Sequence, residues 1–146
     1  MNKPTDGNNE ILTQVHVQSK MMNDIISMMN NKVGDANLRR EIGTQRNEYK
    51  AMSDQALSTL AQKGEVPHKT QKRSQIEGMA DIYLATMINK SPSYIAQILM
   101  EDSLSSVISV TKSVNRYPQA EIAAKDQAES FVSTATDNIN ALKGFL

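Results

Sequence analysis

The chain has 146 residues, and its 16 basic and 16 acidic side chains give a formal net charge of zero. This length fits one domain with a hydrophobic core. The charge balance excludes a broad electrostatic attraction to nucleic acid or to anionic membranes, so we expect neither as a partner. Cysteine is absent, which excludes disulfides, thiolate metal sites and cysteine nucleophiles.

The composition indicates an all-helical domain. The chain contains nine methionines, four tyrosines, two phenylalanines and no tryptophan, and apolar and polar residues nowhere alternate for long. This profile predicts helices around an aliphatic, methionine-filled core. Residues 1–8 are predicted to be a disordered tail, followed by a single helical domain over residues 9–146. Neither a signal-peptide pattern nor an apolar run of about eighteen residues is present, so we expect a cytoplasmic protein.

The first half of the domain is predicted to be a helical hairpin. Apolar residues recur at three- and four-residue steps over residues 9–32 and again over residues 36–62, which predicts two amphipathic helices. Between them, Gly34 suits a left-handed residue that ends a helix, and Asp35 suits an N-cap. So short a break predicts antiparallel packing. The residues expected in the core are Ile11, Val15, Met22, Ile25, Ile26, Met29, Val33, Leu38, Ile42, Tyr49, Met52, Ala56 and Leu60.

A connection that contains a shorter helix follows this hairpin. Gly64 and Pro67 end the second helix, since neither residue continues one easily. Helical spacing resumes over residues 71–88. The residues that carry this spacing are Ile76, Met79, Ala80, Tyr83 and Met87.

The last part of the chain is predicted to be a second hairpin. Ser91 is a good N-cap and Pro92 suits the first helical position, which predicts a helix that runs to about Asn115. Another helix is predicted over residues 119–143. Its inward residues are expected to be Ile122, Val132, Ala135, Ile139 and Leu142, with Gly144 as C-cap and Phe145 and Leu146 folding back on the bundle.

Two hairpins joined by one long connection predict an all-α fold, the ferritin-like four-helix bundle. An up-and-down array of five helices is the alternative. A ferritin-like di-iron site takes a Glu from each of two helices and a Glu-x-x-His from each of the other two. Glu65 and His68 match this motif in letters, but Pro67 argues against continuous helix there. His16, the other histidine, lacks a Glu three residues earlier and lies on a flank. We therefore predict no metal, no cofactor and no catalytic residues.

The fourth long stretch, from Ser93 to Val114, carries an acidic pair in an apolar helix. At 100° per residue, Asp102 projects toward the interior, and Glu101 projects to a flank with Leu104 and Ile108. An unpaired buried carboxylate is costly, so Asp102 should be hydrogen-bonded, protonated or reached by water at an edge. We interpret this region as a packing feature, in preference to a ligand site. The small residues that allow close helix approach are Ser103, Ser105, Ser106 and Ser109.

Two glutamines, Gln18 and Gln45, lie near the centres of the first two apolar stripes. Across the predicted hairpin, Gln18 falls roughly level with Tyr49. A hydrogen bond between this amide and the tyrosine hydroxyl would satisfy both groups and fix the helix register. The alternative is a polar pocket flanked by Glu48.

Three stretches of the chain carry a resemblance to a known group of proteins. They are "LRREIGTQRNEYKAM", "SPSYIAQILMEDSLSSVISVTKSVNRYPQAE" and the closing "NINALKGFL". Over residues 38–146 the chain resembles uncharacterised ferritin-like four-helix-bundle proteins of Gram-positive bacteria. It departs from them at Asp102 and Ser106, where the group has small residues such as glycine, and it lacks acidic residues near Thr134 and Ala135. The resemblance implies the fold and an association with stress or spores, but no assigned activity.

The leading hypothesis is a non-enzymatic, metal-free ferritin-like bundle that acts as a structural or interaction protein and self-associates as a homo-oligomer. Its basis is the fourth helix, which is apolar on nearly all sides because Leu104 and Val107 project away from the Ile95 stripe. Such a helix must be covered on most sides.

Two other functions remain open. One is a di-metal carboxylate oxidoreductase, or an iron-binding ferritin-like protein, that uses Glu48, Glu101 and Asp102 as ligands. The other is a small-ligand binder with a pocket at Gln18, Tyr49 and Asp102.

Overall fold

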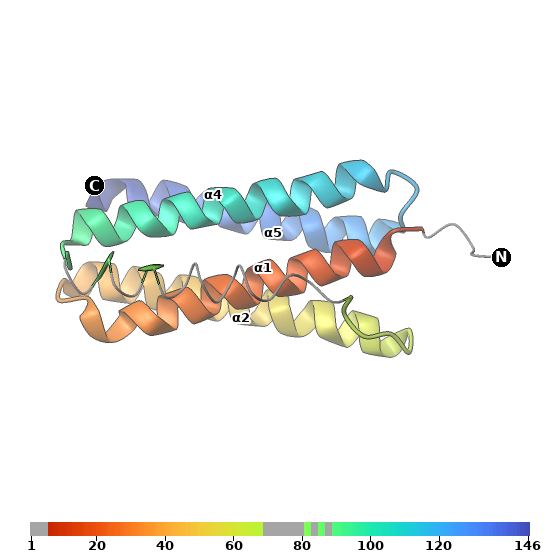
Figure 1. Cartoon of the computed structure of the whole chain (residues 1–146), viewed down its shortest axis with the longest axis horizontal. Helices are drawn as coiled ribbons and strands as arrows, with labels where there is room; N and C mark the ends of the chain where they lie inside the picture. The colour runs from red at the N-terminus through yellow and green to blue at the C-terminus, as the bar shows by residue number, and fades with distance from the viewer. Residues whose placement is uncertain (1–5, 69–80, 83–84, 87–88) are drawn as a thin grey trace.

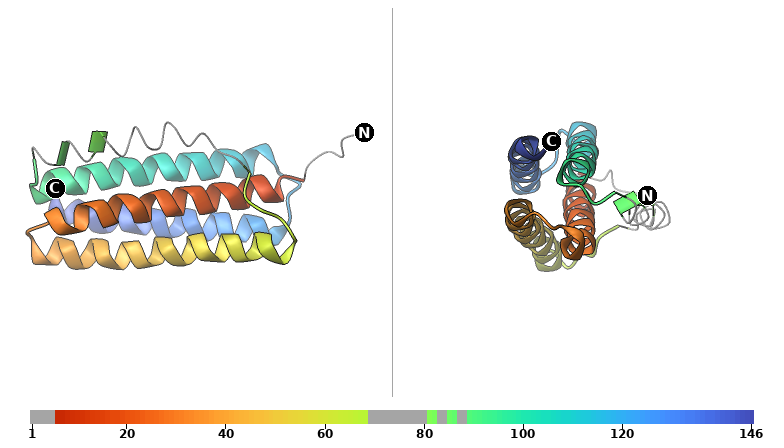
Figure 2. Two further views of the ribbon diagram at one scale, coloured as in Figure 1. Left: turned by 60° about the horizontal axis from the view of Figure 1, so that its bottom comes forward. Right: turned by 90° about the vertical axis from the view of Figure 1, so that its left-hand side faces the viewer.

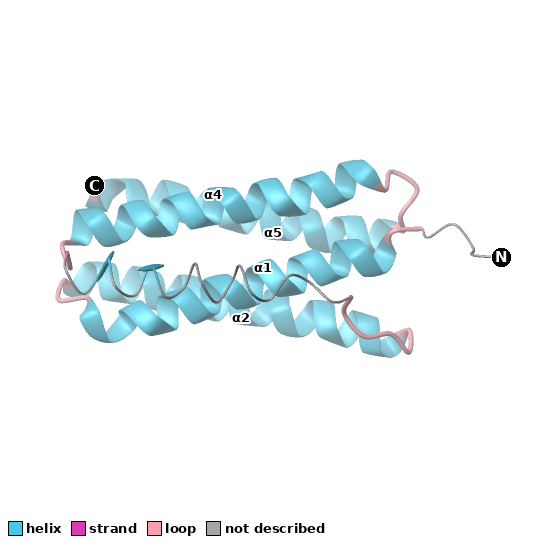
Figure 3. Cartoon of the chain, in the orientation of Figure 1, coloured by secondary structure: helices cyan, strands magenta, loops and turns pink. Residues whose placement is uncertain are grey.

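The computed structural model of the chain is all-helical over the part that it describes, with four long helices packed side by side (Figures 1 and 3). The described residues are 6–68, 81–82, 85–86 and 89–146. The long helices are α1 (Asn8–Met29), α2 (Ala36–Gln62), α4 (Pro92–Arg116) and α5 (Ile122–Leu142), and single 3₁₀ turns follow α1 and α5 at Asn30–Lys32 and Lys143–Phe145. The prediction of an all-α helical bundle is confirmed.

The helices form two hairpins. Helix α1 packs against α2, α4 packs against α5, and α1 also contacts both helices of the second hairpin. Figure 1 shows that α2 and α4 run in the same direction, so the chain between Gln62 and Pro92 links opposite ends of the bundle. Figure 2 shows the four rods from the side and end-on, where they form a square. The predicted shorter helix over residues 71–88 lies mostly outside the described residues, as do Ile76, Met79, Ala80, Tyr83 and Met87.

Two helix starts follow from local capping, as predicted. The backbone N–H of Leu38 donates to the Asp35 carboxylate at 2.8 Å, which caps α2. The N–H of Tyr94 donates to the Ser91 hydroxyl at 3.2 Å, and proline opens α4. These side chains satisfy N–H groups that have no partner inside the helix.

The prediction of a left-handed Gly34 is wrong. Among the described residues, positive φ angles occur only at Gly7 and Gly64. Helix α1 instead ends in a 3₁₀ turn, after which Val33 is extended. The guanidinium of Arg39 donates to the Val33 carbonyl at 2.6 Å, so a side chain from α2 closes this turn.

The start of α1 is more ordered than predicted. Residues 1–5 lie outside the described part of the chain, but Gly7 and Asn8, which were assigned to the tail, are both buried. The side-chain oxygen of Asn8 accepts a hydrogen bond from the Glu121 N–H at 2.7 Å. Asn8 thus caps the start of α5 from another helix. Gly7, with a φ of 84°, lies against the ring of Tyr117 in the turn between α4 and α5.

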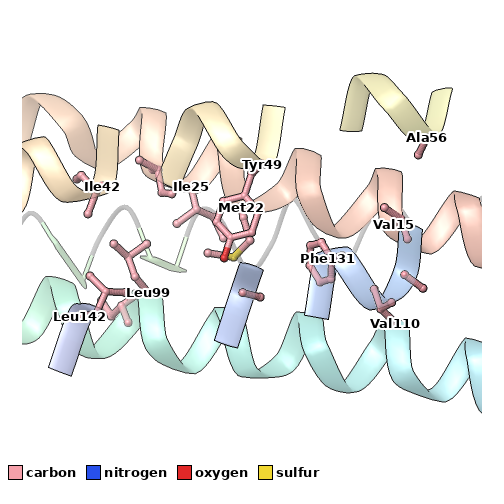
Figure 4. Packing of buried hydrophobic residues seen from close by; sticks show 14 of the residues in the cluster. Val15, Met22, Ile25, Ile42, Tyr49, Ala56, Leu99, Val110, Phe131 and Leu142 are labelled. Atoms are coloured by element: carbon pink, nitrogen blue, oxygen red, sulfur yellow. The ribbon is translucent and has the colours of Figure 1, made fainter. Parts of the chain in front are cut away.

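The core of the first hairpin matches the prediction. Its predicted residues are buried, apart from Met52, which packs partly buried against the others. Figure 4 shows Tyr49 and Phe131 pointing into the space between the helices, with ring centroids 6.1 Å apart. Both side chains are fully buried, so they fill the centre of the bundle.

Helix α5 agrees with the prediction in part, because Ala135 and Leu142 are buried. It begins at Ile122, whose side chain is 76% exposed, and Val132 and Ile139 are only half-buried. Small residues take the inner positions instead. The buried residues of α5 are Ala124, Ala128, Phe131, Ala135, Asn138 and Leu142. Three alanines on this face let α5 approach its neighbours closely, which outweighs the burial of larger side chains on other faces.

The end of the chain agrees with the prediction in part. Phe145 packs against the core, but Leu146 is 61% exposed. Gly144 has no positive φ angle, because the last residues continue as a 3₁₀ turn rather than a left-handed cap.

Two glycines should respond to alanine in opposite ways. At Gly7, a Cβ atom would overlap the ring of Tyr117 and φ is positive, so Gly7→Ala should lower the free energy of unfolding by about 2 kcal/mol or more. At Gly43, inside α2, a Cβ meets nothing, so Gly43→Ala should raise it by about 0.5–1 kcal/mol. Urea unfolding followed by circular dichroism measures both. A neutral Gly7→Ala would contradict the close packing at Tyr117.

Candidate functional site

The outward side of α4 carries a regular stripe of exposed residues. We call it the α4 outer stripe, and it consists of Gln97, Glu101, Leu104, Ile108, Thr111 and Asn115, all exposed. The steps alternate between four and three residues, which is the spacing of side chains that face a partner helix in a coiled coil. Leu104 and Ile108 at its centre are 53% and 47% exposed, and the ends of the stripe are polar.

This stripe borders a groove between α4 and α5. The groove has a volume of about 320 Å³, and its walls include Val114, Ala128 and Val132 together with Thr111 at the edge of the stripe. Val107, which was predicted to project away from the core, is half-buried and packs against it. The exposed apolar surface of α4 therefore comes from Leu104 and Ile108, and the groove extends it toward α5.

Charge is divided along the exposed side of α4. Glu101 is exposed in the N-terminal half, whereas Lys112 and Arg116 are exposed in the C-terminal half. The amide of Gln97 donates to the Glu101 carboxylate at 3.0 Å. The outward side of α4 thus has an acidic half, an apolar centre and a basic half.

The interior holds a layer of uncharged polar groups, but not with the predicted partners. The Tyr49 hydroxyl lies 3.4 Å from the Ser103 hydroxyl, whereas the amide of Gln18 donates to Gln14 at 3.3 Å on the same helix. The predicted bond between Gln18 and Tyr49 is therefore wrong. Gln18 is half-buried and its neighbour Ser19 is fully buried, so the buried face of α1 includes Ser19 rather than Gln18.

Gln45 does lie inside the bundle, as predicted. Its side chain is fully buried, and its amide donates to the Glu41 carboxylate at 2.9 Å and to the Asn138 backbone carbonyl at 3.3 Å. Gln45 thus links α2 to α5. Burial raises the pKa of the nearby Tyr49 hydroxyl, although its hydrogen bond with Ser103 acts in the opposite direction. The raised pKa keeps the phenol neutral.

The acidic pair on α4 divides as predicted, with Glu101 exposed and Asp102 half-buried. Burial, followed by the charge of Glu101, raises the pKa of Asp102 to about 6. Its Oδ2 atom is buried and has no hydrogen-bond partner among the described residues. Asp102 therefore carries the cost expected of a poorly satisfied carboxylate.

The three residues considered as metal ligands, Glu48, Glu101 and Asp102, do not lie together as a ligand set. Glu48 is half-buried on α2, and burial, followed by the charges of Glu41 and Asp137, raises its pKa. Within the described part of the chain, no three His, Cys, Asp or Glu side chains form a group that could hold a metal ion. Glu48, Glu101 and Asp102 thus do not make such a group.

The two histidines lie in different surroundings. His16 Nδ1 is 2.8 Å from the Ser53 hydroxyl, and burial lowers the pKa of His16. His68 lies in the loop after α2, with Nδ1 3.6 Å from the Glu10 carboxylate. The letters Glu65 to His68 are not in a helix, as Pro67 predicted.

Comparison with family models, with curated proteins and with solved structures gave no match. None of the helices that the structure describes has the length and apolarity needed to cross a membrane.

The sequence indicated part of the α4 outer stripe. Leu104 was recognised as outward-facing, and Glu101 and Ile108 were assigned to one flank. Thr111 and the basic half at Lys112 and Arg116 were missed. The alternating steps of four and three residues were the signal that would have placed Thr111 in the same stripe as Leu104 and Ile108. Such steps mark a second helix face, opposite the one that faces the core.

Asp102→Asn should stabilise the protein. The pKa of Asp102, about 6 in the folded state, exceeds its ordinary value of 3.8, so the folded state binds the proton more tightly and loses stability as pH rises from about 4 to 6. Asparagine keeps the shape and stays neutral. We expect a gain of about 1–2 kcal/mol at pH 7.5, after allowance for solvent screening, and less than half of that at pH 4.5.

Urea unfolding at the two pH values measures this gain. Asp126→Asn on α5 is the matched control, because Asp126 is exposed. A destabilised Asp102→Asn at pH 7.5 would show that the carboxylate has a favourable partner in the folded protein.

Proposed function

We propose that the protein is a non-enzymatic, metal-free, ferritin-like helical bundle that acts as a cytoplasmic interaction protein by self-association through the α4 outer stripe. The observation that supports this most directly is the exposure of Leu104 and Ile108, at 53% and 47%, side by side on one helix. Exposed apolar surface with a polar rim is typical of protein–protein contact sites.

The ferritin-like assignment draws support from the chain path. Helices α2 and α4 run in the same direction and belong to different hairpins (Figure 1), and one long crossover between two hairpins is the arrangement of ferritin-like bundles. An association with stress or spores follows from the resemblance to proteins of Gram-positive bacteria.

The polar side chains inside the bundle argue against metal chemistry. The buried polar residues near its centre include Ser19, Gln45, Ser103 and Asn138, which are uncharged. Iron and manganese centres in this type of bundle use inward Glu and His side chains. Neutral hydroxyls and amides suit the packing of four helices better than the binding of a redox metal.

A second copy of the chain is the occupant that fits the stripe. The acidic and basic halves of α4 complement each other, so the same surface can serve on both sides of a contact. Closed symmetric dimers use such self-complementary patches. The cost of exposing Leu104 and Ile108 to water is then recovered on association.

Replacing both apolar residues should disrupt the assembly. We expect the wild-type chain to sediment as a dimer at micromolar concentration, and Leu104→Ser combined with Ile108→Ser to raise the dissociation constant about tenfold or more. Analytical ultracentrifugation measures this, with circular dichroism to check helix content.

Val66→Ser is the matched control, because Val66 is an exposed aliphatic residue in the loop after α2, at 76%. It should leave the dimer unchanged. A wild-type chain that stays monomeric up to about 100 μM would overturn the proposed function, because a dimer that forms at micromolar concentration would be the main species there.

A further inference from the structure

We infer that two copies of the chain pair through antiparallel α4 helices. The two-fold axis passes between the two helices at the level of Ile108. This inference rests on the proposed self-association and specifies its geometry. It follows from the positions of the apolar and charged side chains on the exposed side of α4.

The α4 outer stripe is nearly symmetric about Ile108. Glu101 lies seven residues before it and Asn115 seven residues after it, while Leu104 and Thr111 lie four before and three after. A two-fold axis at Ile108 therefore brings Ile108 onto its own copy and sets Leu104 beside Thr111 of the second copy. Leu104 and Ile108 of both copies are then buried at the centre of the contact, and the polar ends of the two stripes lie at its rim.

Charge selects the antiparallel orientation. In a parallel pair, Glu101, Lys112 and Arg116 would each lie level with their own copies, so no acidic side chain would lie level with a basic one. In the antiparallel pair, Glu101 lies level with the region of Asn115 and Arg116 in the second copy, and Lys112 lies about one turn away. Like charges placed together are unfavourable and opposite charges fix the orientation of a contact.

The three charged side chains also lie on the same edge of the stripe. At 100° per residue, Glu101, Lys112 and Arg116 project within about 60° of one another, on the edge away from the α5 groove. A two-fold axis perpendicular to the helix keeps this edge on the same side of the contact in both copies. Glu101 of one copy therefore lies near Arg116 of the other. An axis parallel to the helix would place them on opposite edges.

Charge reversal tests the orientation. Arg116→Glu should raise the dissociation constant about three- to tenfold, because the new carboxylate faces Glu101 of the second copy at both ends of the interface. Glu101→Arg should do the same. The double variant, Glu101→Arg with Arg116→Glu, should return to within about twofold of wild type, because opposite charges meet again.

Arg40→Glu on α2 is the control for a change in total charge, since Arg40 is exposed and not on α4. The experiments run at low ionic strength, where rim charges act most strongly. Single reversals that match this control, or a double variant without recovery, would overturn the antiparallel geometry. Self-association itself would still be judged by the Leu104 and Ile108 variant, so the two failures are distinguishable.

Introduced cysteines provide a second measurement, because the chain has none. Under oxidation, Ile108→Cys should form a disulfide-linked dimer at the two-fold axis. Asn115→Cys should not, because the two copies of residue 115 would lie about 21 Å apart along the helix at 1.5 Å per residue. Cross-linking of both variants to the same extent would indicate a parallel pair and overturn the inference.

Discussion

The fold depends on how Tyr49 is accommodated at the centre of the bundle. This residue comes from α2, its ring contacts Phe131 of α5, and its hydroxyl reaches Ser103 of α4. A buried hydroxyl needs a partner, so α4 must turn Ser103 inward. The next residue, Leu104, then projects about 100° further around the helix and is left exposed. The apolar outer surface is thus tied to the polar bond inside.

The interior layer of the bundle is made of uncharged polar groups over the residues that the structure describes. Its central groups are hydroxyls and amides, and the interior-facing carboxylate on α4, Asp102, is half-buried with a raised pKa. Neutral groups can share hydrogen bonds between helices without the desolvation cost of charges. Two such bonds join helices here, from Tyr49 to Ser103 and from Gln45 to the Asn138 carbonyl.

The sequence predicted what depends on nearby residues. Asp35 and Ser91 cap helices through N–H groups three residues away, and the apolar periodicity of α1 and α2 located their cores. Apart from the turns at Gly34 and Gly144, the errors concern relations between helices. Ile122 was expected inside because it is large and apolar, but close packing of alanines on α5 decides which face is buried. The burial of Ser19 rather than Gln18 on α1 also depends on all four helices together. For the candidate site, Leu104 was found and the basic half was not.

The hydrogen bond from Glu121 to Asn8 joins residues 113 positions apart. It acts as a clasp between the first turn of α1 and the start of the last helix, and the contact of Gly7 with Tyr117 closes the same corner. Each hairpin can assemble from neighbouring segments, but the clasp forms only once both are in place, because so large a loop is slow to close. Completion of the native bundle therefore depends on a contact between α1 and α5 that neither hairpin can make alone.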